Sequence, residues 1–334
     1  MTSLIRTTRR LMGAAALLPI AAVLLAFTDS TPPPIPEAYM QEIVTPPPTW
    51  SAARAALGRR LFFDTVLSHD RSVSCASCHD PDHAFTDGKA VAEGIGAQHG
   101  NRNTPTIVNR ALGLTQFWDG RAQTLEAQAL GPIANPKEMG LPVEQAVARL
   151  AADPSYEAAF RRAFGGDPDA TRLAQALAAY ERTVYSVDSP FDRFIAGDES
   201  ALSEPARRGL AVFGGKARCG ECHTGPNFTD EAFYSLGVGP DAGRLAVTTL
   251  AQDHGAFKTP TLREIARTGP YMHDGSIATL MEVVEYYDKG CAPHPNLPAK
   301  IQALRLTAQE KADLVAFLES LSGRVVDIAA AEKE

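Results

Sequence analysis

Two five-residue stretches constrain this chain more than any other feature: CASCH at residues 75–79 and CGECH at residues 219–223. In each stretch two thiols stand two residues apart, and a histidine follows at once. Thiols at this spacing can form thioether bonds to both vinyl groups of one porphyrin, and the adjacent imidazole then faces the iron. The pattern predicts two covalently bound haem c groups, held by Cys75, Cys78 and His79 and by Cys219, Cys222 and His223.

A CxxCH motif can also belong to a redox dithiol or to half of a zinc site. The two copies here lie 144 residues apart and lack strand-rich, thioredoxin-like surroundings, which disfavours both alternatives. The fifth cysteine, Cys291, stands alone. We expect it to be a small buried residue or an unreactive thiol, with pairing between molecules as the alternative.

The segments around the two motifs have helical periodicity. Residues 170–184 repeat apolar side chains at helical spacing, and residues 306–321 open with the capping box Thr307-x-x-Glu310 before another apolar stripe. Ser203, with Pro205 two residues later, is typical of a helix start. Because alternating strand patterns are nearly absent, we predict an all-α fold of two cytochrome c-like haem domains packed around a domain junction.

The N-terminus has the pattern of an export signal, since three arginines precede an apolar run from Leu11 to Phe27. The run approaches the length needed to cross a bilayer, so an uncleaved membrane tether is the alternative. Residues 31–48 then contain two proline triplets, which favour an extended spacer. We therefore expect a periplasmic protein.

These signals divide the chain into four predicted segments. They are an export signal or tether (1–28), a proline-rich linker (29–49), a first haem domain (50–198) and a second haem domain (199–334). The C-terminal helix of the second haem domain is a candidate to pack back on the rest of the fold.

Long motifs of this chain resemble those of a known family. LFFDTVLSHDRSVSCASCHDPDHAFTDG, FWDGRAQTLEAQALGPIANPKEMG and FKTPTLREIARTGPYMHDG occur in that order, and the likeness runs from about Leu61 to Leu321. The chain resembles the bacterial dihaem cytochrome c peroxidases and their relative MauG. The resemblance implies that the first haem, on His79, reacts with hydrogen peroxide while the second haem passes electrons.

The resemblance also implies a catalytic pair above the first iron: Glu138, from the loop GPIANPKEMG, and Gln128, from the preceding helix. Pro132, in the same loop, would line the pocket. Splitting the O–O bond needs a group that takes a proton from the near oxygen and returns it to the leaving one, which suits a carboxylate. Burial in a haem pocket should raise the pKa of Glu138. Without the resemblance, we would expect a surface loop with a solvated Glu138 and an exposed Gln128.

Two further roles are implied at the domain junction. Trp118, in FWDGR, would lie between the haems and relay electrons, although its type is more often a core aromatic. Asn103, with the backbone carbonyls of Thr268 and Pro270, matches a calcium site of the family, and oxygen ligands suit that cation. Ordinary turn chemistry is the alternative for these residues.

The chain departs from the family pattern at the first haem. Peroxidases that need reductive activation carry a capping histidine sixteen residues after the first haem's own histidine, and here that position is Ile95. Isoleucine cannot ligate iron, so we expect an open first haem. The alternative is that His99, in a glycine-rich loop, moves in to cap the iron.

A second departure concerns the route by which MauG oxidises a protein substrate. The Trp-Asn pair that precedes the second CxxCH in MauG is Ala217-Arg218 in this chain. This difference disfavours protein oxidation by that route.

The stretch VVEYYDKG predicts a short helix at residues 280–289, because Thr279-x-x-Glu282 forms a capping box before it. Helical spacing points Tyr287 inward and Tyr286 to the side. Position 287 lies fourteen residues after His273, where the ordinary peroxidases carry a methionine ligand of the second iron and MauG a tyrosine. The resemblance thus implies Tyr287 as that ligand, and for His273 a hydrogen-bonding role near the second haem.

The expected function is a periplasmic dihaem peroxidase that takes electrons from a small redox protein, either a cytochrome c or a cupredoxin. One alternative is MauG-like oxidation of a partner protein through a high-valent dihaem state, and another is a non-catalytic electron carrier. The formal net charge of −7 becomes −10 without residues 1–28, which carry three arginines and no acidic residue. This acidity excludes nucleic acid as a partner.

Overall fold

The computed structural model describes residues 51–331. The predicted export signal (1–28) and linker (29–49) lie outside the described residues. Within the part of the chain that the structure describes, no helix is both long and apolar enough to cross a membrane.

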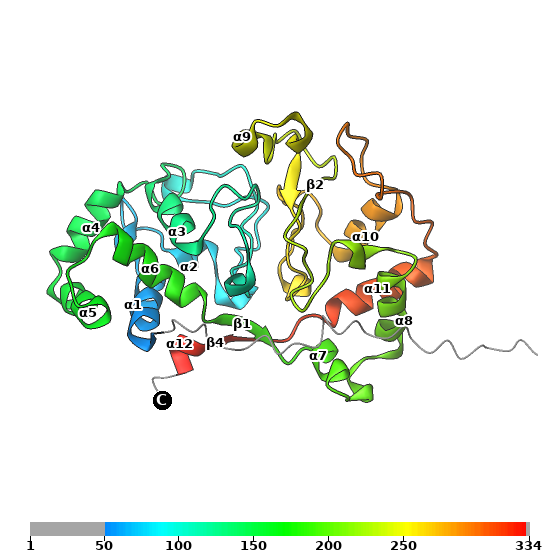
Figure 1. The fold of residues 1–334 in the computed structure, drawn as a ribbon, viewed down its shortest axis with the longest axis horizontal. Helices are drawn as coiled ribbons and strands as arrows, with labels where there is room; N and C mark the ends of the chain where they lie inside the picture. Colours follow the sequence, from blue (N-terminus) through cyan, green and yellow to red (C-terminus); the bar gives the residue numbers. More distant parts are fainter. Residues whose placement is uncertain (1–50, 332–334) are drawn as a thin grey trace, which may run out of the picture. The chain divides into compact units, whose positions relative to one another are not determined.

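The described fold is mostly helical, as the sequence predicts, and divides into two halves along the chain (Figure 1). The helices of the first half are α1 (Ala52–Phe63), α2 (Cys75–Cys78), α3 (Leu125–Ala134), α4 (Val143–Ala151), α5 (Pro154–Phe164) and α6 (Ala170–Glu181). Those that follow are α7 (Pro190–Ile195), α8 (Glu204–Gly214), α9 (Leu245–Thr248), α10 (Leu280–Asp288), α11 (Ala308–Glu319) and α12 (Ile328–Ala331). The strands are β1 (Val184–Val187), β2 (Phe233–Ser235), β3 (Ala256–Lys258) and β4 (Arg324–Asp327).

Each half has its own hydrophobic core, and both cores are built on the same helix crossing. In the first half α1 crosses α6 at Gly58, where a Cβ atom would stand 1.8 Å from the carbonyl oxygen of Ala176. In the second half α8 crosses α11 at Gly209, where a Cβ atom would stand 1.9 Å from the carbonyl oxygen of Asp313. Only glycine permits such close approach of two backbones.

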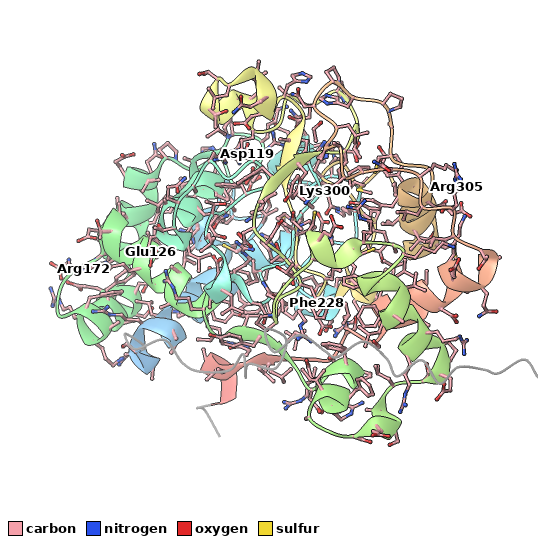
Figure 2. The ribbon with its side chains drawn as sticks, turned by 45° about the vertical axis from the view of Figure 1, so that its right-hand side comes forward. Asp119, Glu126, Arg172, Phe228, Lys300 and Arg305 are labelled. Carbon is pink, nitrogen blue, oxygen red and sulfur yellow. The ribbon has the colours of Figure 1, made fainter. Side chains whose placement is uncertain are left out.

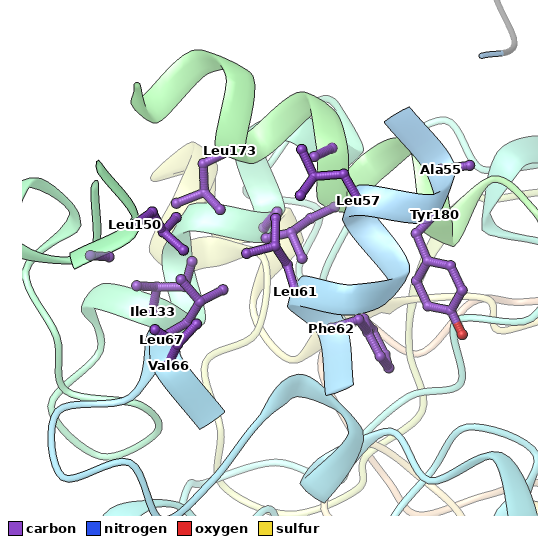
Figure 3. Packing of buried hydrophobic residues seen from close by; sticks show 14 of the residues in the cluster. Ala55, Leu57, Leu61, Phe62, Val66, Leu67, Ile133, Leu150, Leu173 and Tyr180 are labelled. Carbon is purple, nitrogen blue, oxygen red and sulfur yellow. The ribbon is translucent and has the colours of Figure 1, made fainter. Parts of the chain in front are cut away.

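An aromatic pair closes each crossing one helical turn further on. Phe62 packs on Tyr180 with ring centroids 4.9 Å apart, and Phe213 packs on Phe317 with centroids 5.0 Å apart. Figure 3 shows the first of these pairs beside the aliphatic side chains of the first core. The same spacing, Gly58 with Phe62 and Gly209 with Phe213, therefore builds the helix crossing of each half.

The end of the chain returns to the first half. Strand β4 follows α11 and pairs antiparallel with β1, with Val184 opposite Asp327. Ala329 is then buried in the first core. The helix that returns is therefore the short α12, whereas the long helix α11 packs on α8 in the second half.

The helix starts agree with the capping signals. Ser203 caps α8, and the capping boxes of Thr307 with Glu310 and of Thr279 with Glu282 are both formed. These three predictions are confirmed.

Two helix ends differ from the predicted ones. Helix α6 stops at Glu181 instead of reaching residue 184, because the backbone from Val184 onward pairs with β4. Pro132 lies inside α3 and not in the loop that follows. The helix continues past this proline because Ile133 is fully buried in the first core and the Asn135 amide closes the last turn on the Gly131 carbonyl at 3.0 Å.

Candidate active site

A cavity of about 1110 Å³ is lined by residues of both halves. Small-molecule sites usually occupy about 300–1,000 Å³, so the space is large even for one bulky ligand. All of the site residues predicted from the sequence line this cavity. They are Cys75, Cys78, His79, Asn103, Trp118, Gln128, Pro132, Glu138, Cys219, Cys222, His223, Thr268, Pro270 and Tyr287.

The two motif histidines are held in the same way. The Nδ1 atom of His79 lies 3.1 Å from the carbonyl oxygen of Phe85, and that of His223 lies 2.9 Å from the carbonyl oxygen of Phe228, which Figure 2 labels. Since a carbonyl can only accept, each Nδ1 donates its hydrogen and each Nε2 keeps its lone pair. This is the tautomer that binds a metal through Nε2, and the carbonyl bond fixes the ring orientation.

The motif cysteines have the environment of attachment sites. Burial raises the pKa of the Cys75 and Cys219 thiols to about 12, which is the opposite of an activated redox dithiol. Among the described residues no cluster of three or more His, Cys, Asp or Glu side chains could hold a metal ion. Two thiols, an oriented imidazole and a large cavity fit covalent haem at both places.

Helix α3 and the loop after it contribute three of the predicted site residues to the cavity lining. Gln128 and Pro132 stand one helical turn apart on α3, so both face the cavity from one side. Glu138 follows in the loop, where the Asn135 Nδ2 donates to its Oε1 at 2.7 Å. Burial raises the pKa of Glu138 against the lowering effects of Asn135 and the positive charge of Arg121. The three residues thus meet at one wall, with the carboxyl oriented.

Ile95 packs against this same loop. Its amide donates to the Glu138 carbonyl at 2.8 Å, and its Cδ1 atom lies 2.4 Å from where a Cβ atom on Gly140 would stand. His99 is exposed, and its backbone forms a bridge with Glu93. Neither Ile95 nor His99 is among the residues that line the cavity. For His99 to bind the iron of the first haem, the backbone bridge between Glu93 and His99 would have to break.

Trp118 is fixed between the two halves. Its indole Nε1 donates to the Asn103 carbonyl at 2.8 Å, and its own carbonyl accepts from the Lys258 amide at 2.8 Å. The Asn103 amide in turn donates to the His273 carbonyl at 2.7 Å. Trp118 therefore stands at the domain junction, with its indole bonded to the first half and its backbone carbonyl bonded to the second.

The residues predicted to bind calcium also lie at the junction. The Asn103 Nδ2 donates to the Lys89 carbonyl at 2.8 Å, and a cis peptide bond joins Gly269 to Pro270. Asn103, Thr268 and Pro270 line the same cavity. Calcium binding by these oxygen atoms stays a prediction.

The two neighbouring tyrosines of α10 have different surroundings. The Tyr286 hydroxyl donates to the Leu236 carbonyl at 2.7 Å and accepts from the Ala292 amide at 3.1 Å. The Tyr287 hydroxyl forms no hydrogen bond within residues 51–331, and its side chain lines the cavity near Cys219 and Cys222. Burial raises the pKa of Tyr287. Tyr286 is thus a packing residue, and Tyr287 faces the space beside the second motif.

An ion network that the sequence did not indicate joins the two halves. Arg102 donates to Asp119 at 2.6 Å and to Asp241 at 2.8 Å, and Figure 2 labels Asp119 at this position. Arg110 pairs with Glu231 at 2.9 Å. The Arg102–Asp241 and Arg110–Glu231 pairs each join residues more than a hundred positions apart in the chain, so no local pattern could reveal them.

Glu181 is a buried carboxyl of the cavity that the sequence prediction missed. It is 6% exposed, and burial raises its pKa to about 8. A sequence signal was available, because Glu181 follows Leu177 by one helical turn and so falls on the apolar face of α6.

Comparison with known proteins agrees with this geometry. A family model described as di-haem cytochrome c peroxidase matches residues 52–200, and a cytochrome c model matches residues 206–322. The methylamine utilization protein MauG of Methylorubrum extorquens is 44% identical over 274 residues, which cover 80% of this chain and 78% of that protein.

The chain belongs to the di-haem cytochrome c peroxidase and MauG family.

Other members of this family are also similar. The cytochrome c551 peroxidase of Nitrosomonas europaea is 39% identical over 82% of this chain and 81% of its own length. The crystal structure of a MauG-like protein associated with microbial copper homeostasis superposes with a TM-score of 0.78 at 34% identity, covering 85% of this chain and 95% of that one. Membership of the family confirms the two cytochrome c-type domains and makes the protein an oxidoreductase with two c-type haems.

Proposed function

We propose that this protein reduces hydrogen peroxide at the haem held by Cys75, Cys78 and His79. Electrons would arrive through the haem held at the second motif, from a small redox protein such as a cytochrome c or a cupredoxin. The observation that carries the proposal is the partly buried carboxyl of Glu138, which Asn135 orients in a cavity that Gln128 also lines. A simple electron carrier needs no such acid–base pair.

The haem, once bound, supplies an iron that can coordinate peroxide and exchange electrons. Glu138 takes the proton from the near peroxide oxygen and returns it to the leaving oxygen. Its raised pKa suits both steps, because burial makes the carboxyl hold a proton more readily between taking it up and returning it. The Gln128 amide can donate a hydrogen bond to the same oxygens, and the Pro132 ring limits the water beside them.

Ile95 supports reaction without prior reduction of the second haem. Its side chain cannot ligate iron, and its amide is bonded to the Glu138 loop at 2.8 Å. The first haem should therefore be open to peroxide in the fully ferric protein.

Tyr287 favours a second candidate function, the oxidation of a partner protein. A phenolate oxygen from Tyr287 would stabilise the oxidised second haem and lower its reduction potential, so that oxidising equivalents could be shared through Trp118. Against this, Ala217-Arg218 stands where MauG carries its substrate-facing Trp-Asn pair. We therefore retain peroxide reduction as the first candidate.

Two accompanying features are part of the proposal. Asn103, Thr268 and Pro270 would bind calcium at the junction, where oxygen-only ligands suit a hard cation. The protein would act in the periplasm, since an export pattern precedes a chain with two haem c sites.

A stopped-flow experiment tests the function. The ferric holoprotein, as isolated, is mixed with hydrogen peroxide while the absorption of the haems is followed. A rapid spectral change that returns to the resting spectrum when reduced cytochrome c or cupredoxin is added supports a peroxidase. An unchanged spectrum would leave the electron-carrier alternative.

A further inference from the structure

A series of aromatic rings leads away from the first haem-binding histidine. The His79 ring lies 6.3 Å from Phe62 between centroids, and Phe62 lies 4.9 Å from Tyr180. Phe62 lines the cavity, and Tyr180 stands behind it with no exposed surface. Phe63 continues the series 6.1 Å from Tyr180 and is 38% exposed. Figure 3 shows the adjacent rings of Phe62 and Tyr180.

The Tyr180 hydroxyl is not needed for packing. The second half of the molecule makes the same helix crossing, and there Phe317 takes the place of Tyr180 against Phe213. An aromatic ring is therefore sufficient to close this crossing. Burying a hydroxyl costs free energy unless it forms a hydrogen bond. Since only the first half carries this hydroxyl at the crossing, packing does not explain it.

A carboxylate from the other end of the chain meets this hydroxyl. The Tyr180 hydroxyl donates to the Asp327 Oδ2 at 3.3 Å, and the Arg59 Nε holds the same oxygen at 2.7 Å. Asp327 ends β4, the strand that returns from the second half. Burial and the Asp327 charge raise the pKa of Tyr180, so the phenol stays protonated until an electron is removed.

We propose that Tyr180 is a redox-active residue, which gives one electron toward the first haem through the Phe62 ring while its phenolic proton passes to Asp327. This inference rests on the proposed peroxidase function. Reduction of hydrogen peroxide to two waters takes two electrons and two protons. When no donor protein is present, Tyr180 supplies one of these electrons as its O–H bond breaks. The second electron would come from a haem iron, and the two protons would come from solvent, because the Tyr180 proton stays on Asp327.

The product is a neutral tyrosyl radical beside a protonated Asp327. An electron from the donor protein later restores the phenol, and the proton returns from Asp327. Tyr180 thus provides an outlet for oxidising equivalents that is separate from Trp118 at the domain junction. It lies on α6, behind α1, so it would protect the cavity residues from oxidation when peroxide exceeds the donor.

The test is electron paramagnetic resonance on the ferric holoprotein, frozen soon after one equivalent of peroxide is added without donor. We expect a radical signal that narrows when the protein is made with ring-deuterated tyrosine. Tyr180→Phe should abolish this signal, since the variant keeps the ring and loses the hydroxyl. Asp327→Asn should weaken it, because the proton acceptor is lost.

Tyr156→Phe is the matched control. Tyr156 is also buried and also donates to a carboxylate, Asp64, at 2.6 Å, but within residues 51–331 no ring pair links it to His79. The signal should survive in this variant. A signal that persists unchanged in Tyr180→Phe would overturn the proposal, as would its loss in Tyr156→Phe alone.

Two measurements keep the outcomes separate. If peroxide changes the wild-type haem spectrum but produces no tyrosyl signal, the relay is wrong and the peroxidase function stands. If peroxide leaves the haem spectrum unchanged, both are wrong. Should Tyr180→Phe fail to fold, the Asp327→Asn variant decides the question, because it keeps the Tyr180 ring and removes the proton acceptor. A tyrosyl signal of unchanged intensity in Asp327→Asn then refutes the proposal.

Discussion

Replacing Glu138 with glutamine tests the chemistry of the cavity wall without altering its shape. A glutamine can still accept the 2.7 Å hydrogen bond from the Asn135 Nδ2, so the loop should keep its position against Ile95. The amide cannot exchange a proton with peroxide. Loss of one general acid–base group costs about 10²–10⁴-fold in rate, which corresponds to about 3–5 kcal/mol of transition-state stabilisation.

The assay is the second-order rate constant for peroxide with the ferric holoprotein, measured from pH 5 to 9. In the wild type the carboxylate form of Glu138 acts first as the base, so the rate constant should rise with pH until it levels off above the raised pKa of this group. In Glu138→Gln the rate constant should be low and nearly independent of pH. The spectra of both resting haems should be unchanged.

The control is Glu144→Gln, which changes an exposed glutamate in the first turn of α4. This variant should react like the wild type. A Glu138→Gln variant with wild-type kinetics and the wild-type pH profile would move the acid–base role to another residue of the cavity, with Glu181 as the first candidate.

Three further outcomes are expected. Tyr287→Met should raise the reduction potential of the second haem in a spectroelectrochemical titration, whereas Tyr286→Phe should leave it unchanged; equal potentials in Tyr287→Met and the wild type would refute iron ligation by Tyr287. Gly58→Ala should lower the melting temperature sharply, because its Cβ would stand 1.8 Å from a backbone oxygen of α6, while Gly214→Ala, with no atom within 4 Å, should be neutral or slightly stabilising. Glu181→Gln should raise the melting temperature at pH 8 but not at pH 4. The pKa of Glu181 in the folded protein, about 8, lies above its usual 4.5, so the stability that protonated Glu181 contributes is complete below pH 4.5 and is lost as the pH rises through 8. A difference in melting temperature that does not depend on pH would contradict this assignment.

Local patterns were enough to predict the two haem-attachment motifs and several helix starts. The two CxxCH motifs specify haem attachment because thioether formation depends only on the spacing of neighbouring residues. Capping boxes set the starts of α10 and α11 for the same reason, since each involves groups three residues apart. Helical periodicity separated Tyr287 from Tyr286, and the structure has the first on the cavity wall and the second bonded to Leu236.

Only the tertiary structure decided which distant groups meet. The sequence placed Pro132 in a loop, but burial of Ile133 keeps the last turn of α3 helical around it. The sequence likewise extended α6 to residue 184, where pairing with β4 ends the helix. In both cases long-range packing outweighed a local conformational preference, of proline against helix in α3 and of the apolar pattern for helix in α6. Such preferences are worth at most about 3 kcal/mol per residue.

The carboxylates of the molecule illustrate the same division. A catalytic role for Glu138 is implied by its motif and stays a prediction, whereas nothing near Asp327 in the sequence indicates that it meets Tyr180, 147 residues earlier. That contact exists because β4 returns from the second half to pair with β1. The sequence alone therefore determines where haem can attach, because attachment needs only residues that are neighbours in the chain. The contacts that orient the side chains and shift their pKa values form only when the two halves have folded together.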